Sequence, residues 1–180
     1  VEEAKEAAEA TVVSTASEVG NHIGPLVSEL QFTKVQDLIQ KGIDEGARLV
    51  TGGVGRPEGL NRGYFVRPTV FADCHNDMQI MREEIFGPVL SMMPFDTEEE
   101  AIRIANDTDY GLPNYVQTSD PEKARRVARD PRTGMVDMNG RARASGSPFG
   151  GMKQSGNGRE GGEWGIDEFL EVRAIGGWPT

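Results

Sequence analysis

The spacing of apolar residues predicts a long amphipathic helix in the first quarter of the chain. Starting at Ser28, apolar residues recur every three or four positions, which is the period of one buried helix face. The face expected to be buried consists of Leu30, Val35, Leu38, Ile39 and Ile43. The helix is expected to end near Gly46, and residues 1–10 carry a second, shorter helical pattern.

Further along the chain, strand and helix patterns alternate. Branched and aromatic residues predict strands at 48–51, 63–73, 90–96, 113–119 and 134–139. Pro68 indicates a bulge or an edge, because proline cannot donate to a sheet ladder. Thr97 with Glu100 forms a capping box, and Asp120 precedes Pro121 at the first position of another helix. This alternation predicts an α/β fold whose twisted, partly parallel sheet is flanked by helices.

Composition narrows the classes of protein to consider. A chain of 180 residues is long enough for one domain with a core. The net charge of −10 argues against binding the phosphate backbone of a nucleic acid. No apolar run approaches the roughly 20 residues of a membrane span, so no membrane partner is expected. The single cysteine, Cys74, excludes an internal disulfide and favours a cytoplasmic location.

The sequence context argues against a functional role for several candidate motifs. Residues 156–161, GNGREG, fit the GxGxxG expression, but no strand precedes them and too little chain follows for a βαβ unit. Cys74 and His75 are adjacent, and neighbouring side chains point apart, so Cys74 is expected to be a surface or half-buried thiol. His22 and His75 lack the spacing of metal ligands, so no metal is expected.

Glycine becomes frequent after residue 140, in a stretch without helical or strand periodicity. Arg141 and Arg143 lie in this stretch. Exposed loop arginines are usually solvated, although these two could also contact an acidic substrate. Both interpretations stay open.

The stretch EEIFGPV places two carboxylates beside an apolar pair and a Gly-Pro corner. Glu83 and Glu84 are expected on the surface, and Ile85 and Phe86 inside. One interpretation is a corner between a helix and a strand. The alternative is a pocket edge, where one glutamate binds polar groups and the phenylalanine forms an apolar floor.

Three stretches in this order resemble motifs of the aldehyde dehydrogenase superfamily: EEIFGPV at 83–89, NDTDYGL at 106–112 and PFGGMKQSGNGRE at 148–160. The resemblance covers nearly the whole chain. It implies that residues 1–168 are the C-terminal portion of the catalytic domain. It also implies that residues 169–180 are an oligomerisation strand and tail.

The resemblance assigns roles to individual residues. Glu84 is similar to the glutamate that holds the nicotinamide ribose of NAD or NADP, and Phe86 to the aromatic packed against that cofactor. Phe149 resembles the residue lining the aldehyde tunnel, and Glu160 the glutamate that relays a proton through water. Asn139 resembles the asparagine that ends a strand beside the substrate pocket and fixes the loop after it.

The implied reaction oxidises an aldehyde to a carboxylic acid through a thioester on a cysteine. That nucleophile is expected upstream of this chain, so the 180 residues alone are expected to be inactive. Lys153 and Arg159 match motif positions that are interpreted as structural, whereas Asp137 replaces a tryptophan common in relatives. A homo-oligomer, dimer or tetramer, is expected through residues 169–177.

Two alternatives remain. The chain begins inside a helical pattern without an N-cap, which favours a piece of a longer enzyme over a free-standing assembly or binding module. The second alternative is the branch of the family that transfers the acyl group to coenzyme A instead of water. A water-relaying Glu160 argues mildly against that branch.

Overall fold

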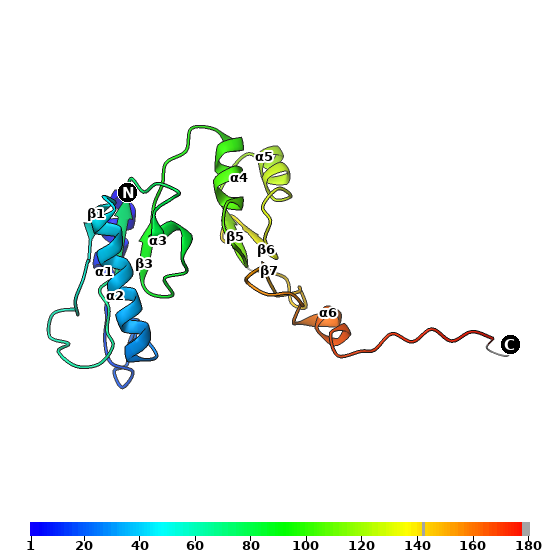
Figure 1. The fold of residues 1–180 in the computed structure, drawn as a ribbon, viewed down its shortest axis with the longest axis horizontal. Helices are drawn as coiled ribbons and strands as arrows, with labels where there is room; N and C mark the ends of the chain where they lie inside the picture. Colours follow the sequence, from blue (N-terminus) through cyan, green and yellow to red (C-terminus); the bar gives the residue numbers. More distant parts are fainter. Residues whose placement is uncertain (142, 178–180) are drawn as a thin grey trace. The chain divides into compact units, whose positions relative to one another are not determined.

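The computed structural model describes residues 1–141 and 143–177, and it divides the chain into two compact units (Figure 1). Unit 1 comprises Val1–Phe95 and unit 2 comprises Asp96–Thr180. The sequence suggested one domain, whereas each unit has its own helices and its own strand pairings. Both contain parallel strands beside helices, so the predicted α/β class is confirmed.

Unit 1 is a three-stranded sheet with helices packed against it. Its elements are α1 (Glu2–Ala10), α2 (Glu29–Asp44), β1 (Arg48–Thr51), β2 (Thr69–Ala72), α3 (Gln79–Arg82) and β3 (Val89–Ser91). The strand order is β1-β2-β3, with β1 antiparallel and β3 parallel to β2. The predicted strand at 63–73 forms only after Pro68, because a central strand must donate on both sides and proline has no N–H.

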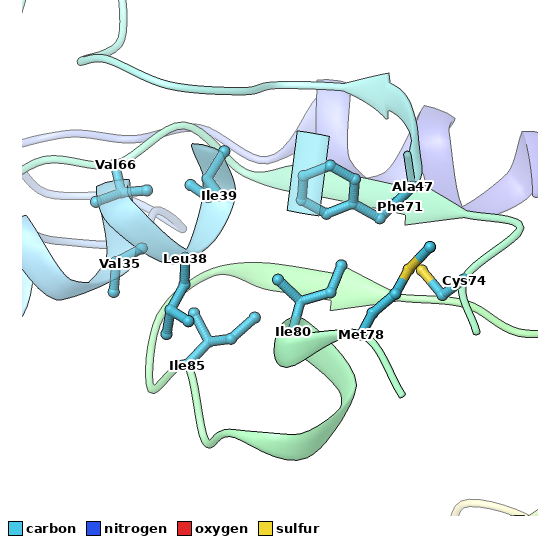
Figure 2. Packing of buried hydrophobic residues seen from close by; sticks show 10 residues of the cluster. All are labelled: Val35, Leu38, Ile39, Ala47, Val66, Phe71, Cys74, Met78, Ile80 and Ile85. Carbon is cyan, nitrogen blue, oxygen red and sulfur yellow. The ribbon is translucent and has the colours of Figure 1, made fainter. Parts of the chain in front are cut away.

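The core of unit 1 is a cluster of buried side chains from α2, β2, α3 and the loops that adjoin them (Figure 2). The cluster contains Val35, Leu38, Ile39, Ala47, Val66, Phe71, Cys74, Met78, Ile80 and Ile85. All four residues of β2 are buried, which explains why its sequence, TVFA, shows no polar alternation.

Helix α2 begins as predicted, because the Ser28 side chain accepts a hydrogen bond from the Gln31 N–H at 3.2 Å. Only the middle of its predicted apolar face is buried. Leu30 is 82% exposed and Ile43 is also exposed. The prediction of one continuous buried face is therefore wrong at both ends.

Unit 2 combines short strand pairs with three helices among its described residues. Its elements are α4 (Glu98–Asn106), β4 (Tyr110–Gly111), β5 (Pro113–Val116), α5 (Pro121–Val127), β6 (Met135–Met138), β7 (Met152–Lys153) and α6 (Gly162–Asp167). Strands β5 and β6 pair in parallel, and β4 and β7 pair antiparallel. Thr97 and Asp120 cap α4 and α5 as predicted.

Residues 169–177 form no strand within the chain, contrary to the sequence pattern. After the turn that ends α6, this segment contains no helix or strand up to residue 177 (Figure 1). A strand requires a hydrogen-bonded neighbour, and the apolar side chains of this segment, such as Phe169 and Val172, are exposed. Pairing with another subunit stays a prediction, and residues 178–180 of the predicted tail lie outside the described part.

Within the described ranges, no helix has both the length and the apolar composition of a membrane span.

Candidate functional site

In unit 1, the loop of the EEIFGPV motif is held in place by α2. The side-chain amide of Gln31 donates to the carbonyls of Ile85 and Phe86, at 3.0 and 3.1 Å. The Lys34 ammonium donates to the Glu84 carbonyl at 2.7 Å. The Ile85 side chain belongs to the buried cluster of unit 1 (Figure 2). The loop is therefore fixed through its backbone and one anchor, which leaves other side chains free to face outward.

Phe86 is one of these outward side chains. Its φ of 57° lies in the left-handed region, which is uncommon for a residue with a bulky side chain. The ring is 69% exposed, although its neighbour Ile85 is buried. The expectation that both apolar residues lie inside is wrong for Phe86, because the left-handed backbone turns the second side chain away from the core.

Glu84 is exposed beside it. Across the residues that the structure describes, no hydrogen bond from the chain reaches its carboxylate, whereas Glu83 accepts one from Gln79. An aromatic ring and an unpaired carboxylate thus face solvent on one rigid loop. Such a loop can offer a flat apolar surface and a hydrogen-bond acceptor to a ligand.

In unit 2, Phe149 and Glu160 are paired directly. Each backbone N–H donates to the other residue's carbonyl at 2.8 Å, forming an isolated antiparallel bridge. The bridge borders a hollow of about 290 Å³. The hollow is lined by Leu112, Phe149, Gly150, Gly151, Ser155, Asn157, Gly158, Arg159 and Glu160. Both residues predicted from the last motif therefore lie at one concave site.

Two cations of this motif are used internally. The Arg159 guanidinium donates to the Gly151 carbonyl at 2.8 Å. The Lys153 ammonium donates to the carbonyls of Asn106 and Thr108, at 2.9 and 3.0 Å. Both contacts tie distant backbone segments together, which agrees with the structural interpretation of these positions.

The side chain of Asn139 contacts the loop that follows the neighbouring strand. Its side-chain oxygen accepts a hydrogen bond from the Thr118 N–H at 2.8 Å. Thr118 follows β5, the parallel neighbour of the strand that Asn139 ends. The side chain therefore fixes the loop between β5 and α5. Its role in the loop after its own strand stays a prediction, and Asn139 is not among the residues that line the hollow.

Arg143 makes contacts that the sequence reasoning did not foresee. Its guanidinium carbon lies 5.3 Å from the centre of the Phe149 ring, and its Nε lies 3.5 Å from a carboxylate oxygen of Asp137. Nη1 also contacts the sulfur of Met135. Met135 and Asp137 are two positions apart on β6, so they share one face. The opposite charges at 137 and 143 were the only sequence signal for this contact.

Cys74 is buried in the core of unit 1 and is 1% exposed. The expectation of a surface or half-buried thiol is wrong, because Cys74 lies just after β2 and its side chain packs in the buried cluster. Burial raises the pKa of the Cys74 thiol, which disfavours the reactive thiolate. The neighbouring His75 N–H donates to the Met78 sulfur. Cys74 is thus a core residue, and its burial is unfavourable for a nucleophile.

Neither unit, in its described residues, gathers three His, Cys, Asp or Glu side chains into a group that could hold a metal ion.

The chain is similar to known proteins along nearly its whole length. The model of the aldehyde dehydrogenase family matches residues 1–175, and the chain belongs to this family. A curated relative is the 3-succinoylsemialdehyde-pyridine dehydrogenase of Pseudomonas sp, which is 53% identical over 167 residues. That match covers 93% of this chain and 35% of the relative.

Solved structures give the same result. The aldehyde dehydrogenase of Bartonella henselae superposes with a TM-score of 0.94 at 60% identity, over 97% of this chain and 37% of that one. A mutant of aldehyde dehydrogenase C from Pseudomonas syringae, solved with NAD+ and octanal, gives 0.92 at 48% identity, over 95% and 35%. This chain therefore spans about a third of the length of the relatives it matches.

Proposed function

We propose that this chain is the C-terminal part of the catalytic domain of an NAD(P)-dependent aldehyde dehydrogenase. The whole enzyme would oxidise an aldehyde to a carboxylic acid through a thioester on a cysteine outside these residues. The observation that carries the proposal is the Phe149–Glu160 bridge, which puts an aromatic wall and a carboxylate at one hollow. A crystallised relative that contains NAD+ and an aldehyde supports it.

The loop at 83–88 fits a nicotinamide cofactor. The carboxylate of Glu84 can accept two hydroxyl hydrogen bonds of a ribose, and bonds to a charged acceptor are the stronger kind. The exposed ring of Phe86 can pack against a planar group and keep water away from it. When bound, the cofactor supplies the acceptor for the hydride that leaves the substrate. Because the loop is already fixed by Gln31 and Lys34, little ordering is needed on binding.

The hollow in unit 2 fits the aldehyde. Phe149, which is 38% exposed, offers an apolar wall. Glu160 is exposed at the same bridge, where its carboxylate can accept a proton from a water molecule and pass it on. Water is then the acceptor of the acyl group, which makes a carboxylic acid the expected product rather than a coenzyme A ester.

The attacking sulfur belongs to a part of the enzyme outside this chain. Cys74 is unsuited to the role, because it is buried and its raised pKa keeps it protonated. We therefore expect the isolated 180 residues to produce no NADH from any aldehyde. The proposal also includes a cytoplasmic location and a homo-oligomer, dimer or tetramer, formed through residues 169–177.

The sharpest test uses the full-length enzyme that contains this chain. Glu84→Gln should raise the KM for NAD+ by about ten- to a hundredfold, because it weakens hydrogen bonds to a charged acceptor. Glu83→Gln is the matched control: it is the adjacent exposed glutamate, and its KM should stay at the wild-type value. Steady-state kinetics with varied NAD+ and NADP+ measure both.

Equal effects of the two substitutions would contradict the role of Glu84. Identification of the product by mass spectrometry completes the test. Formation of an acyl-coenzyme A, with no carboxylic acid, would contradict the water-dependent reaction.

A further inference from the structure

Helix α6 lies directly against the backbone of Glu160. A Cβ placed on Gly165, in the middle of this helix, would lie 3.1 Å from the carbonyl carbon of Glu160 and 3.2 Å from its Cα. These distances are tighter than ordinary van der Waals contact, so an added Cβ would require the Glu160 backbone to shift by a few tenths of an ångström. The position of the Glu160 backbone is therefore coupled to the position of α6.

Glu168 extends this contact from the end of α6. One of its carboxylate oxygens accepts a hydrogen bond from the backbone N–H of Arg159 at 3.1 Å. The same carboxylate lies 3.4 Å from where a Cβ on Gly158 would stand. Glu168 thus covers the two backbone units immediately before Glu160.

The other sides of Glu160 are held from within its own motif. Its backbone is paired with Phe149, and the Arg159 guanidinium donates to the carbonyls of Gly151 and Gly158, at 2.8 and 2.6 Å. The contact from Glu168 differs because it comes from beyond the motif, across α6. Removing this contact would loosen the backbone of Gly158 and Arg159. Both residues line the hollow.

We propose that Glu168 is a positioning residue for the proton-relay glutamate, Glu160. The inference rests on the proposed function, since it depends on the role of Glu160. It assigns Glu168 no contact with substrate or cofactor. Its carboxylate orients the Arg159 peptide and so sets the place of the Glu160 carboxylate at the hollow. The contact needs an oxygen acceptor at this position, and the negative charge is secondary. A glutamine at position 168 can therefore preserve it, whereas an alanine cannot.

Kinetics of the full-length enzyme test the catalytic consequence. Glu168→Ala should lower kcat by about ten- to a hundredfold, since misplacing a group by about 1 Å can reduce a rate a hundredfold. The KM for the aldehyde should not change. Glu168→Gln should restore kcat to near the wild-type value. Glu163→Ala is the matched control, because Glu163 is an exposed glutamate on the same helix.

A loss of kcat that is equal in Glu168→Ala and Glu163→Ala would overturn the inference, because it would reflect the helix and not the contact. Failure of Glu168→Gln to restore kcat would overturn it as well.

A second measurement does not depend on activity. In the 180-residue chain, the Arg159 amide should exchange with solvent about tenfold faster in Glu168→Ala than in wild type, as expected for the loss of one hydrogen bond. NMR-detected exchange measures this amide, and Glu168→Gln should retain its protection. Unchanged exchange in Glu168→Ala would overturn the positioning role. If exchange responds but Glu160→Gln leaves kcat unchanged, the failure lies in the proposed role of Glu160.

Discussion

The two units of this chain are stabilised in different ways. Unit 1 has a side-chain core, centred on Phe71 and supplied by α2 and β2. Among the described residues of unit 2, Met135 is the only buried apolar side chain. Unit 2 instead relies on backbone pairing, on glycines that let segments approach closely, and on side chains that bond to carbonyls. The comparison shows that a hollow can be assembled largely from backbone with little apolar core beneath it.

In unit 2, some glycines lie close to backbone atoms of other segments, in contrast to the packed side chains in the core of unit 1. A Cβ on Gly134 would collide with the carbonyl oxygen of Gly150, and one on Gly111 would lie 2.6 Å from the carbonyl oxygen of Arg132. Backbone atoms cannot swing aside as a flexible side chain can. Adding a Cβ at these glycines should therefore disrupt unit 2 through excess volume, whereas truncating a core side chain should disrupt unit 1 through lost volume.

The largest expected effect is in unit 1. Phe71 is 0% exposed, so Phe71→Ala should lower the free energy of unfolding of this unit by about 3–5 kcal/mol, through lost burial and the cavity left behind. Hydrogen exchange read by mass spectrometry on peptides from each unit measures the two separately. Peptides of unit 2 should keep their wild-type exchange. Equal acceleration in both units would show that they unfold as one.

A smaller effect is expected from the reverse change in unit 2. Gly134→Ala should destabilise this unit by about 1–3 kcal/mol, as overpacking of a tight site does. Urea unfolding followed by tryptophan fluorescence reports it, because Trp164 and Trp178 both belong to unit 2 and unit 1 contains no tryptophan. The control is Gly176→Ala, where an added Cβ meets nothing within 4 Å. A Gly134→Ala midpoint as high as that of the control would refute the backbone contact.

The smallest expected effect concerns an ion pair of unit 2. Arg126 donates to both carboxylate oxygens of Glu98, at 2.6 and 2.9 Å, and these bonds lower the pKa of Glu98. A lowered pKa means that the stabilisation is complete above the ordinary glutamate value of about 4.3 and is lost as pH falls below it. Since the pair is exposed, the effect should be small.

Urea midpoints of unit 2 at about pH 6 and about pH 3 measure this effect, because the two values bracket the ordinary pKa of glutamate. Glu98→Gln should show a smaller decrease between them than wild type. Glu99→Gln, at the neighbouring exposed position, serves as the control and should follow wild type. Parallel curves for all three proteins would exclude the Glu98 contribution.

Local signals in the sequence predicted the local features of the fold. The caps at Ser28, Thr97 and Asp120 and the strand at 48–51 were found because each depends on a few adjacent residues. Strands β4 and β7 were missed, since each has two residues and exists only through pairing across about forty positions. Helix α6 was missed because glycine-rich sequence hides a helical pattern.

The sequence could propose residues for the candidate site but not their geometry. Motif resemblance singled out Phe149 and Glu160, and the structure places them on one bridge. It could not indicate that Phe86 turns outward, because that depends on one left-handed φ angle. The Arg143 contact with Phe149 was equally hidden, since it depends on how an aperiodic loop returns to β6.

Ile85 and Phe86 are consecutive, yet one lies in the core of unit 1 and the other faces solvent. A change in core volume that moves Ile85 should therefore also move the exposed ring of Phe86, because one peptide bond joins the two residues. If Phe86 packs against the coenzyme as proposed, laboratory evolution for heat tolerance that alters the side chains around Ile85 should change coenzyme affinity in the same step.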